Sequence, residues 1–358
     1  MPAYKYENDS SWYVVTQYTD WTGAKKAKCK RGFKTKKEAL AWERVFHQQT
    51  AGDLEMPFDV FVELYCQDIK PRIKENTWLT KEHIITKKIL PYFKEKKINQ
   101  ITTKDVIEWQ NQLLAFRDEN RQPYSQTYLK TVHNQLSAIF NHAIRYYDLR
   151  SNPAAKAGNM GVEESKEMLF WTKDEYQKFS ELMMDKPISF YAFEMLYWTG
   201  IREGELLALT PADFDFEKKT VKISKSYQRL KGQDVITSPK TRKSNRTVQM
   251  PDFLAIEMQE FFQLQYGLRK KDRIFNITKS YLHHEMDRGS KEAGVKRIRI
   301  HDLRHSHISL LIDMGFSAVA IADRVGHESI DITYRYAHLF PSKQIEMATK
   351  LYDMNKGA

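Results

Sequence analysis

The chain has 358 residues, and at about 150 residues per domain this length favours two or three domains. Lys and Arg total 57 against 46 Asp and Glu, so the formal net charge of +11 suggests a polyanionic partner, either nucleic acid or an anionic membrane surface. A hydrophobic content of 41% excludes a wholly disordered chain, and two cysteines, Cys29 and Cys66, exclude a disulfide framework. Because no apolar run is long enough to cross a membrane and no signal-type N-terminus is present, we expect a soluble, intracellular protein.

The first fifty residues are expected to form a small unit of two or three strands followed by one helix. Residues 12–18 are aromatic and β-branched, as in a strand, and turn-forming residues follow at 21–23. Thr35 and Glu38 have the spacing of a capping box, which predicts a helix with one apolar face made by Ala39, Trp42 and Phe46.

A basic stretch lies between these elements. Residues 25–37 include eight Lys or Arg and no acid. Such a run is often only a solvated charged face, but here the aromatic neighbours and the missing acids favour contact with DNA. The residues expected to make that contact are Lys25, Lys26, Lys28, Lys30, Arg31 and Lys34.

Residues 51–53 have the composition of a linker, and the pattern from Pro57 to about Asn152 is helical. Residues 102–105 predict one helix start, and Ser125 precedes a second helix. In that second helix apolar residues recur at three- and four-residue intervals, which predicts a buried stripe of Leu129, Val132, Leu136, Ile139 and Ala143. We expect a compact domain of four or five helices, which in a basic protein is a candidate DNA clamp.

The third unit is expected to follow an interdomain linker. Ser151-Asn152-Pro153 predicts the end of the helical unit, and the residues after it, to 166, are small and polar. A capping box at 172–175 then opens helices that run to about Leu209. Residues 220–227 and 246–250 are expected to be strands joined through a hairpin, with helices resuming from Pro251. The expected fold is therefore multidomain and mainly α with small β-sheets.

Two segments of the third unit place cations where a phosphate could bind. In 199–205, two glycines allow close approach to a bulky ligand, and Arg202 offers a planar fork suited to phosphate oxygens. In the basic turn 238–246, a lysine could reach into a DNA groove or act as a general acid. Taken alone, each segment is more often an ordinary surface feature.

The segment 301–307 is more informative because it combines histidines with an arginine. On a helix, His301 and Arg304 share one face, so an imidazole that moves protons would lie beside a guanidinium that stabilises phosphoryl oxygens. Metal binding by His301 and His305 is the alternative. It is disfavoured because a zinc helix would carry Glu where this chain has Asp302, and because the adjoining arginine would repel a cation.

The segment 324–338 supplies a candidate nucleophile. Gly326 is expected to end one helix and His327 to lie near the start of the next, and Tyr336 follows nine residues later. A phenol is nucleophilic only where cations and hydrogen bonds favour its phenolate. Tyr334 is the rival, but residues two apart on a helix point in different directions, so only one of the two tyrosines can face a phosphate.

Together, these four segments resemble the tyrosine recombinases, and more closely the phage-type and conjugative-transposon integrases. The pattern is Thr-Gly-Ile-Arg-Glu-Gly-Glu, Pro-Lys-Thr in a basic hairpin, His-Asp-Leu-Arg-His, and Gly-His followed by Tyr-Ala-His. The family's Tyr-x-His ending favours Tyr336 over Tyr334. The resemblance implies an arm-type DNA-binding domain of small sheet and helix at 1–52, a helical core-DNA-binding domain at 55–153, a linker at 154–168, and a mixed, mainly α catalytic domain with a C-terminal tail at 169–358.

The resemblance also implies a set of catalytic side chains, namely Arg202, Lys240, His301, Arg304, His327 and Tyr336. Arg202 and Arg304 would hold the scissile phosphate, and His327 would hydrogen-bond one of its oxygens. Glu205 would support Arg202 from behind.

The remaining members of the set would handle protons and the covalent bond. Lys240 would protonate the leaving 5′ oxygen, and His301 would assist proton transfer. Tyr336 would attack phosphorus and form a 3′-phosphotyrosine link. Arg242 and Lys243, in the same hairpin as Lys240, are expected to contact DNA.

The implied function is site-specific DNA recombination that integrates or excises a mobile element. A type IB topoisomerase-like enzyme and a catalytically silent DNA-binding regulator on the same scaffold are the alternatives. Two DNA-binding units argue against the topoisomerase-like enzyme, and the complete catalytic set argues against the silent regulator. We expect no cofactor and no metal, because the sequence has no nucleotide fingerprint and a phosphotyrosine link conserves the energy of the phosphodiester.

The expected partners are double-stranded DNA with core-type and arm-type sites, further copies of the chain in a homotetramer on that DNA, and accessory DNA-bending or directionality factors. The expected location is the bacterial cytoplasm, on DNA and with no membrane. Residues 345–354 are amphipathic and are expected to dock as a helix, either on their own domain or on a neighbouring protomer.

Overall fold

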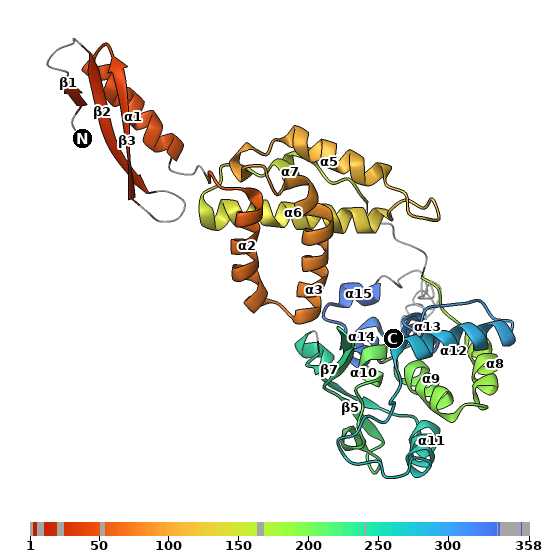
Figure 1. Cartoon of the computed structure of the whole chain (residues 1–358). Coiled ribbons are helices and arrows are strands. Elements are labelled where there is room, and N and C mark those ends of the chain that lie inside the picture. Colours follow the sequence, from red (N-terminus) through yellow and green to blue (C-terminus); the bar gives the residue numbers. More distant parts are fainter. Residues whose placement is uncertain are drawn as a thin grey trace. The chain divides into compact units, whose positions relative to one another are not determined.

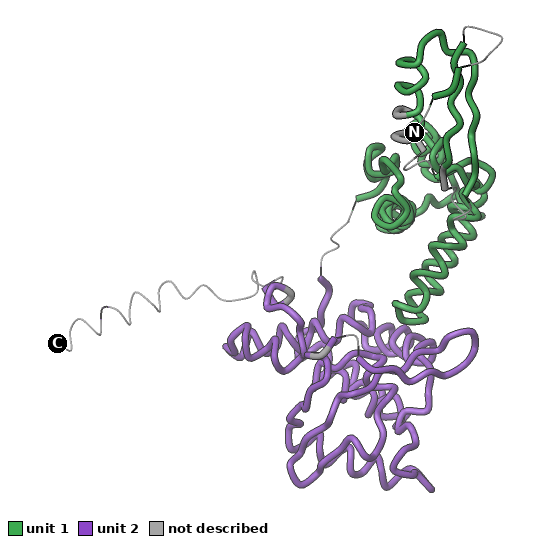
Figure 2. The backbone as a smooth tube through the Cα atoms, turned by 90° about the vertical axis from the view of Figure 1, so that its left-hand side faces the viewer, with its two compact units in different colours: residues 1–165 green, residues 166–358 purple. Residues whose placement is uncertain are grey.

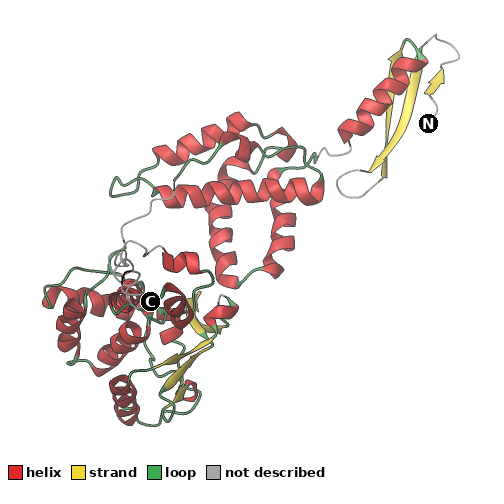
Figure 3. Ribbon diagram, turned by 180° about the vertical axis from the view of Figure 1, so that it is seen from behind, coloured by secondary structure: helices red, strands yellow, loops and turns green. Residues whose placement is uncertain are grey.

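The structure is a computed structural model, and it describes residues 3–5, 11–19, 25–50, 54–162, 168–239, 241–334, 336 and 352. The chain divides into two compact units, residues 1–165 and 166–358, and each is described by itself (Figure 2). Over the described residues the fold is mainly helical with small antiparallel sheets, as predicted (Figure 3). No helix within these residues has the length and apolar composition that crossing a membrane requires.

The N-terminal part of the first unit is a three-stranded antiparallel sheet with one helix packed on it (Figure 1). Its elements are β1 (Ala3–Lys5), β2 (Trp12–Thr19), β3 (Lys25–Phe33) and α1 (Lys36–Thr50), with β2 in the middle of the sheet. Buried Val14 and Ala39, flanked by Trp12, Phe33 and Trp42, join the sheet to the helix. The predicted order of strands followed by one helix is confirmed.

The predicted capping of α1 differs in one hydrogen bond. The hydroxyl of Thr35 accepts the backbone N–H of Glu38 at 3.1 Å, as a capping box requires. The Glu38 carboxylate, however, accepts the backbone N–H of Lys34 at 3.0 Å rather than that of Thr35. Thr35 is nevertheless the N-cap, and the helix begins at Lys36, as the pattern predicted.

The rest of the first unit is a helical bundle. Its helices are α2 (Phe58–Ile69), α3 (Glu75–Ile84), α4 (Leu90–Phe93), α5 (Thr103–Ala115), α6 (Gln126–Tyr147) and α7 (Pro153–Ala157). A capping box between Thr102 and Asp105 opens α5, as predicted. The apolar stripe predicted for α6 is buried throughout, and its part from Val132 to Ala143 shares one core with Phe58, Phe93 and Trp109.

The expected linker at 154–168 begins with ordered structure. Asn152 caps α7 by accepting the backbone N–H of Ala155 at 2.9 Å, and Pro153 occupies the first helical turn, where its missing N–H costs nothing. Ala154 is fully buried in the core of the bundle. Residues 153–157 therefore belong to the bundle, while 163–167 lie outside the described residues.

The second unit is larger and mixes helices with two small sheets. Its helices are α8 (Lys173–Met183), α9 (Pro187–Thr199), α10 (Glu203–Leu206), α11 (Asp252–Gln263), α12 (Lys279–Glu292), α13 (Asp302–Asp313), α14 (Ala318–Val325) and α15 (Ile330–Tyr334). The predicted capping box at Thr172 and Glu175 opens α8. Helix α9 is buried on nearly every side, so it is the central element of this core.

The strand predicted at 220–227 is two strands in different sheets. Strand β5 (Thr220–Ile223) pairs with β4 (Phe214–Asp215) and with β8 (Arg246–Gln249), whereas β6 (Ser226–Leu230) pairs with β7 (Gln233–Thr237) as a hairpin. The chain leaves the first sheet at 224–225, where the sequence has no Gly or Pro to mark the break. The helix predicted at 345–354 falls outside the described residues apart from Tyr352.

Candidate active site

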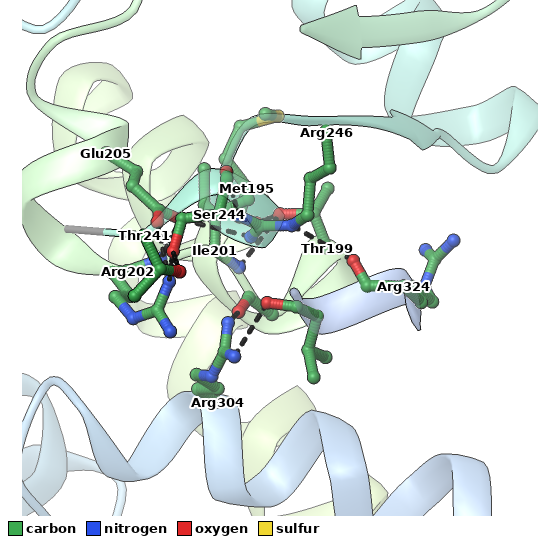
Figure 4. Close-up of polar contacts among 12 residues, drawn as sticks. Met195, Thr199, Ile201, Arg202, Glu205, Thr241, Ser244, Arg246, Arg304 and Arg324 are labelled. Atoms are coloured by element: carbon green, nitrogen blue, oxygen red, sulfur yellow. Dashed lines mark hydrogen bonds and ion pairs between the residues drawn. The ribbon is translucent and has the colours of Figure 1, made fainter. Parts of the chain in front are cut away.

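Arg202 lies between the end of α9 and the start of α10. Helix α9 ends at Gly200, which has φ +64°, and a Cβ there would lie 2.6 Å from Cδ2 of His307, so this turn requires glycine. Arg202 then donates from its backbone N–H to Oε2 of Glu205 at 3.0 Å and from its guanidinium to Oε1 at 2.8 Å (Figure 4). Its side chain is 37% exposed, so the guanidinium is fixed from behind and open to a ligand in front.

The Glu205 carboxylate is buried between two guanidiniums. Arg246 donates to its Oε2 at 3.0 Å, opposite the bond from Arg202 to Oε1. Burial alone would raise the pKa of Glu205, but the charges of Arg246 and Arg202 outweigh burial, and the pKa lies below its ordinary value. The carboxylate is therefore ionised and holds both arginines.

Among the described cations of the site, Arg304 is the most deeply buried, with 3% of its surface exposed. From α13 it donates to the carbonyl of Gly200 at 2.7 Å and to the carbonyl of Val325 at 2.6 Å (Figure 4). Burial, followed by the charges of Arg202 and Arg246, lowers its pKa to about 9. It remains protonated at neutral pH, and the two carbonyl bonds use two of the five N–H donors of a guanidinium.

His301 and His305 lie at the start of α13 with their rings 5.2 Å apart. Desolvation, followed by the neighbouring His305 and Arg304, lowers the pKa of His301 to about 4. Burial also lowers the pKa of His305. Both imidazoles are neutral at physiological pH, so each can accept a proton.

Tyr336 is buried, and its hydroxyl meets the Nδ1 atom of His305. Its ring packs on Ile308, Ile312 and Val325. The rival Tyr334 is 54% exposed. Of the two tyrosines, only Tyr336 thus has its hydroxyl among the histidines that begin α13.

His327 is held by the turn that ends α14. Gly326, with φ +69°, donates its N–H to the Asp323 carbonyl at 3.1 Å, and His327 donates its N–H to the Ala322 carbonyl at 2.9 Å, the two bonds of a Schellman motif. The His327 ring bonds the hydroxyl of Thr333 through Nδ1 at 2.8 Å. Burial and nearby arginines lower its pKa to about 3, so the ring is neutral.

The predicted Lys240 lies outside the described residues, and so does the side chain of Arg242. The residues that follow Lys240 approach the site from two directions. Ser244 lies 3.4 Å from the Arg202 guanidinium, and the ammonium of Lys243 donates to the carbonyl of Glu328 at 3.0 Å. Lys243 was expected to contact DNA; in the structure it joins the turn between β7 and β8 to the loop after His327.

The basic residues predicted for the N-terminal unit lie on β3 and just after it. All are exposed, namely Lys25, Lys26, Lys28, Lys30, Arg31 and Lys34. Within the described residues, no three His, Cys, Asp or Glu side chains are grouped as a metal site would need.

Three residues that the sequence reasoning did not assign take part in the site. Arg246 bonds Glu205, and Arg324 donates through Nε to the buried His307 at 3.1 Å. His305, considered only as a possible metal ligand, contacts Tyr336. All three lie within or beside the segments that the sequence singled out. Their partners are distant in the chain, so the spacing of residues within a motif could not predict these contacts.

Comparison with known proteins identifies the family. Residues 169–343 match the model described as "Phage integrase family", residues 58–114 the "Phage integrase, N-terminal SAM-like domain", and residues 2–50 the "Arm DNA-binding domain". The ICEBs1 integrase of Bacillus subtilis strain 168 is 30% identical over 340 residues, which cover 89% of this chain and 90% of that protein. The chain belongs to the phage integrase family of tyrosine recombinases. The resemblance seen in the motifs is thereby confirmed, and the protein is an integrase that breaks and rejoins DNA.

Solved structures agree on the fold. The Tn1549 transposon integrase in complex with a circular intermediate DNA matches with a TM-score of 0.66 and 20% identity, over 82% of this chain and 99% of that one. A lambda integrase dimer bound to a core site matches with a TM-score of 0.59 and 16% identity, over 93% of each chain. Both share the mainly α, multidomain architecture found here.

Proposed function

We propose that this integrase cleaves DNA with Tyr336 as its nucleophile and rejoins it through a 3′-phosphotyrosine intermediate. The observation that carries the proposal is the position of the Tyr336 hydroxyl, which lies against His305 and interacts electrostatically with Arg304. The neutral His305 orients the hydroxyl and can accept its proton. The nearby arginine favours the phenolate that attacks phosphorus.

The phosphate is held by Arg202 and Arg304 in this proposal. Arg202 is open to solvent in front, and the fork of Arg304 keeps N–H donors beyond those that bind the two carbonyls. Two guanidiniums fixed before the substrate arrives can stabilise the charge of the phosphorane without reorganisation. His327, neutral and rigidly held, adds a hydrogen bond to a phosphate oxygen.

Side chains of this protein account for the bonds and protons of the reaction. The Tyr336 oxygen forms a bond to phosphorus, the bond to the 5′ oxygen breaks, and Lys240 supplies the proton that this oxygen needs. His301, neutral at physiological pH, assists proton transfer. When a 5′ hydroxyl of another strand attacks the phosphotyrosine, the same steps run backwards and the strand is resealed.

The same chain is proposed to hold two classes of DNA site. The exposed cations of β3, in domain 1–52, bind the arm-type DNA site. The helical domain 55–153 binds the core-type site, together with Arg242 and Lys243 between β7 and β8. The linker 154–168 and the catalytic domain 169–358 follow. The relatives support this proposal, since one solved lambda integrase structure is a tetramer bound to a Holliday junction. We propose a homotetramer on DNA that integrates or excises a mobile element in the bacterial cytoplasm, aided by DNA-bending or directionality factors.

Covalent trapping tests the nucleophile. A nicked duplex that loses its short 5′ fragment after cleavage should trap wild-type protein as a covalent complex, and Tyr336→Phe should abolish this product while binding the duplex normally. Tyr334→Phe is the matched control, because it removes an exposed hydroxyl two residues away, and it should trap as wild type does. A covalent complex formed by Tyr336→Phe would overturn the assignment.

A further inference from the structure

One buried guanidinium outside the expected catalytic set touches three of its segments. Arg246 begins strand β8, and its side chain is 7% exposed. It donates to the Glu205 carboxylate at 3.0 Å, to the backbone carbonyl of Ser244 at 3.1 Å and to the backbone carbonyl of Arg324 at 3.1 Å (Figure 4). Because these partners come from α10, the turn between β7 and β8, and the end of α14, one side chain joins three parts of the fold.

The contact with α14 completes the end of that helix. The last four carbonyls of a helix have no partner within it. Here the carbonyls of residues 322 and 323 accept the N–H groups of His327 and Gly326, the carbonyl of Arg324 accepts Nε of Arg246, and that of Val325 accepts Arg304. Arg246 and Arg304 thus bind neighbouring carbonyls directly ahead of His327, at the helix end where the dipole favours cations.

Through its contact with Glu205, Arg246 also helps to fix the position of the Arg202 guanidinium. Glu205 Oε1 accepts the Arg202 guanidinium, while Oε2 accepts Arg246 and the Arg202 backbone N–H. Without Arg246, the buried carboxylate would lose one of the two cations that offset its burial. The orientation of Arg202 therefore depends on a residue 44 positions further along the chain.

The turn at Gly326 is shaped to admit Arg246. A Cβ at Gly326 would lie 2.9 Å from Cδ of Arg246 and 2.9 Å from the carbonyl oxygen of Lys243. A cavity of about 410 Å³, lined by Arg246, Lys243 and His327 among others, opens beside the guanidinium. The glycine thus lets the turn before β8 and the end of α14 approach each other with the arginine between them.

From these contacts we infer that Arg246 is a positioning residue of strand cleavage, which sets Arg202 through Glu205 and sets the Arg304–His327 end of α14 through its backbone. It is too deeply buried to serve as a main contact to DNA. A lysine could not replace it, because a single ammonium cannot reach the three divergent acceptors that a planar fork reaches. This inference rests on the proposed function.

The first experiment separates cleavage from binding. Arg246→Lys and Arg246→Ala, in the full chain, should lower the single-turnover rate of covalent trapping by about 100-fold, the scale expected when catalytic groups are misplaced by about 1 Å. The dissociation constant for the same duplex should change by less than about twofold, because Arg246 lies behind the site. Arg269→Ala is the control, since Arg269 is 84% exposed and pairs only with nearby Asp272 among the described contacts. Trapping at the wild-type rate by Arg246→Lys would overturn the inference.

Chemical rescue distinguishes positioning from a general loss of stability. Ethylguanidinium can enter beside residue 246 through the cavity, and it should restore trapping by Arg246→Ala at least tenfold. Ethylammonium has the same charge but no planar fork, and it should not. Arg246→Ala could instead lower the thermal unfolding midpoint and lose DNA binding and trapping together. If neither ion then restores any of these, the residue is only structural and the inference fails.

A pair of glycine variants displaces Arg246 without removing it. Gly326→Ala puts a Cβ against Arg246, whereas Gly294→Ala carries the same strain of a positive φ, +64°, with no atom within 4 Å of its Cβ. Trapping should fall with Gly326→Ala and remain at the wild-type rate with Gly294→Ala. Equal rates for the two would contradict the inference. A covalent complex formed by Tyr336→Phe would instead overturn the proposed function, so the two failures are distinguishable.

Discussion

The cations of the N-terminal sheet and those of the second unit occupy opposite environments. On β3, the lysines and Arg31 are exposed along the strand. In the second unit, the side chains of Arg246 and Arg304 are almost wholly buried and donate hydrogen bonds to carbonyls and to Glu205. Lys and Arg contribute to the net charge of +11 in both units. Only the exposed ones can bind DNA phosphates and release counterions from DNA.

This difference separates affinity from chemistry. An exposed lysine is hydrated, flexible and free to adjust to a phosphate backbone, so its contribution to binding falls steeply with salt. A buried guanidinium is fixed before the substrate arrives and is screened little by salt, so it contributes most where charge develops in the transition state. Variants of the two classes should therefore fail in different assays.

The largest effect is expected at Arg304. Arg304→Lys keeps the positive charge but cannot bind the Gly200 and Val325 carbonyls and a phosphate at once, so cleavage should fall by about a thousand-fold, as for loss of a transition-state donor. The affinity for DNA should change by less than about threefold. Single-turnover trapping and a binding titration on one duplex measure both quantities.

The control for Arg304 is Arg299→Lys. Arg299 lies just before α13, is 68% exposed and pairs with Asp302, so its variant should cleave at a rate close to wild type. An Arg304→Lys variant that loses affinity and cleavage in equal measure would show that the buried cation acts in binding after all.

Signals that are local in the chain predicted structure well. The stripe from Leu129 to Ala143 and the capping boxes at Thr102 and Thr172 depend on residues three or four apart, and all were found as predicted. The break at 224–225 was missed because it depends on pairing with the distant β8, and Ser224-Lys225 carries no turn signal of its own.

The same difference between local signals and long-range contacts applies to the candidate site. Arg202, Arg304 and Tyr336 were predicted because their motifs resemble those of a family. Arg246 starts a strand after a basic turn, which is where a surface arginine is common, and nothing in its neighbourhood indicates that it meets Glu205 and the end of α14. Such contacts are set by how β8, α10 and α14 pack, which is a property of the folded core rather than of spacing.

A smaller effect is expected on the N-terminal sheet. Lys28→Gln together with Lys30→Gln removes two exposed charges from β3, so affinity for an arm-type duplex should fall by about tenfold at low salt. The slope of log K against log salt should become shallower by up to about 2, near 0.9 for each lost phosphate contact. Trapping on a core-type suicide duplex should be unchanged.

A charge-matched control accompanies the β3 variant. Lys104→Gln with Lys218→Gln also removes two charges, at positions 86% and 79% exposed in other parts of the chain, and it should leave the arm-type salt slope unaltered. Equal slopes for the two double variants would mean that net charge alone, rather than the β3 surface, governs binding to the arm site.

The smallest effect concerns stability at acidic pH. Burial, followed by the charges of Arg324 and Arg304, lowers the pKa of His307 to about 3, whereas an unfolded histidine titrates near 6.5. Between these values the unfolded chain binds a proton that the folded chain does not, so the free energy of unfolding falls as the pH drops below about 6.5. One such group contributes a slope of at most about 1.4 kcal/mol per pH unit.

Replacement of the histidine should remove that slope. His307→Gln keeps an acceptor for the Arg324 guanidinium but cannot titrate, so urea unfolding of the full chain between pH 4.5 and 6.5 should depend less on pH, by about 1 kcal/mol per unit. His284→Gln is the control, because His284 is exposed on α12, and its variant should keep the wild-type slope. An unaltered slope in His307→Gln would mean that this buried histidine is not among the groups that make the stability of the unit depend on pH.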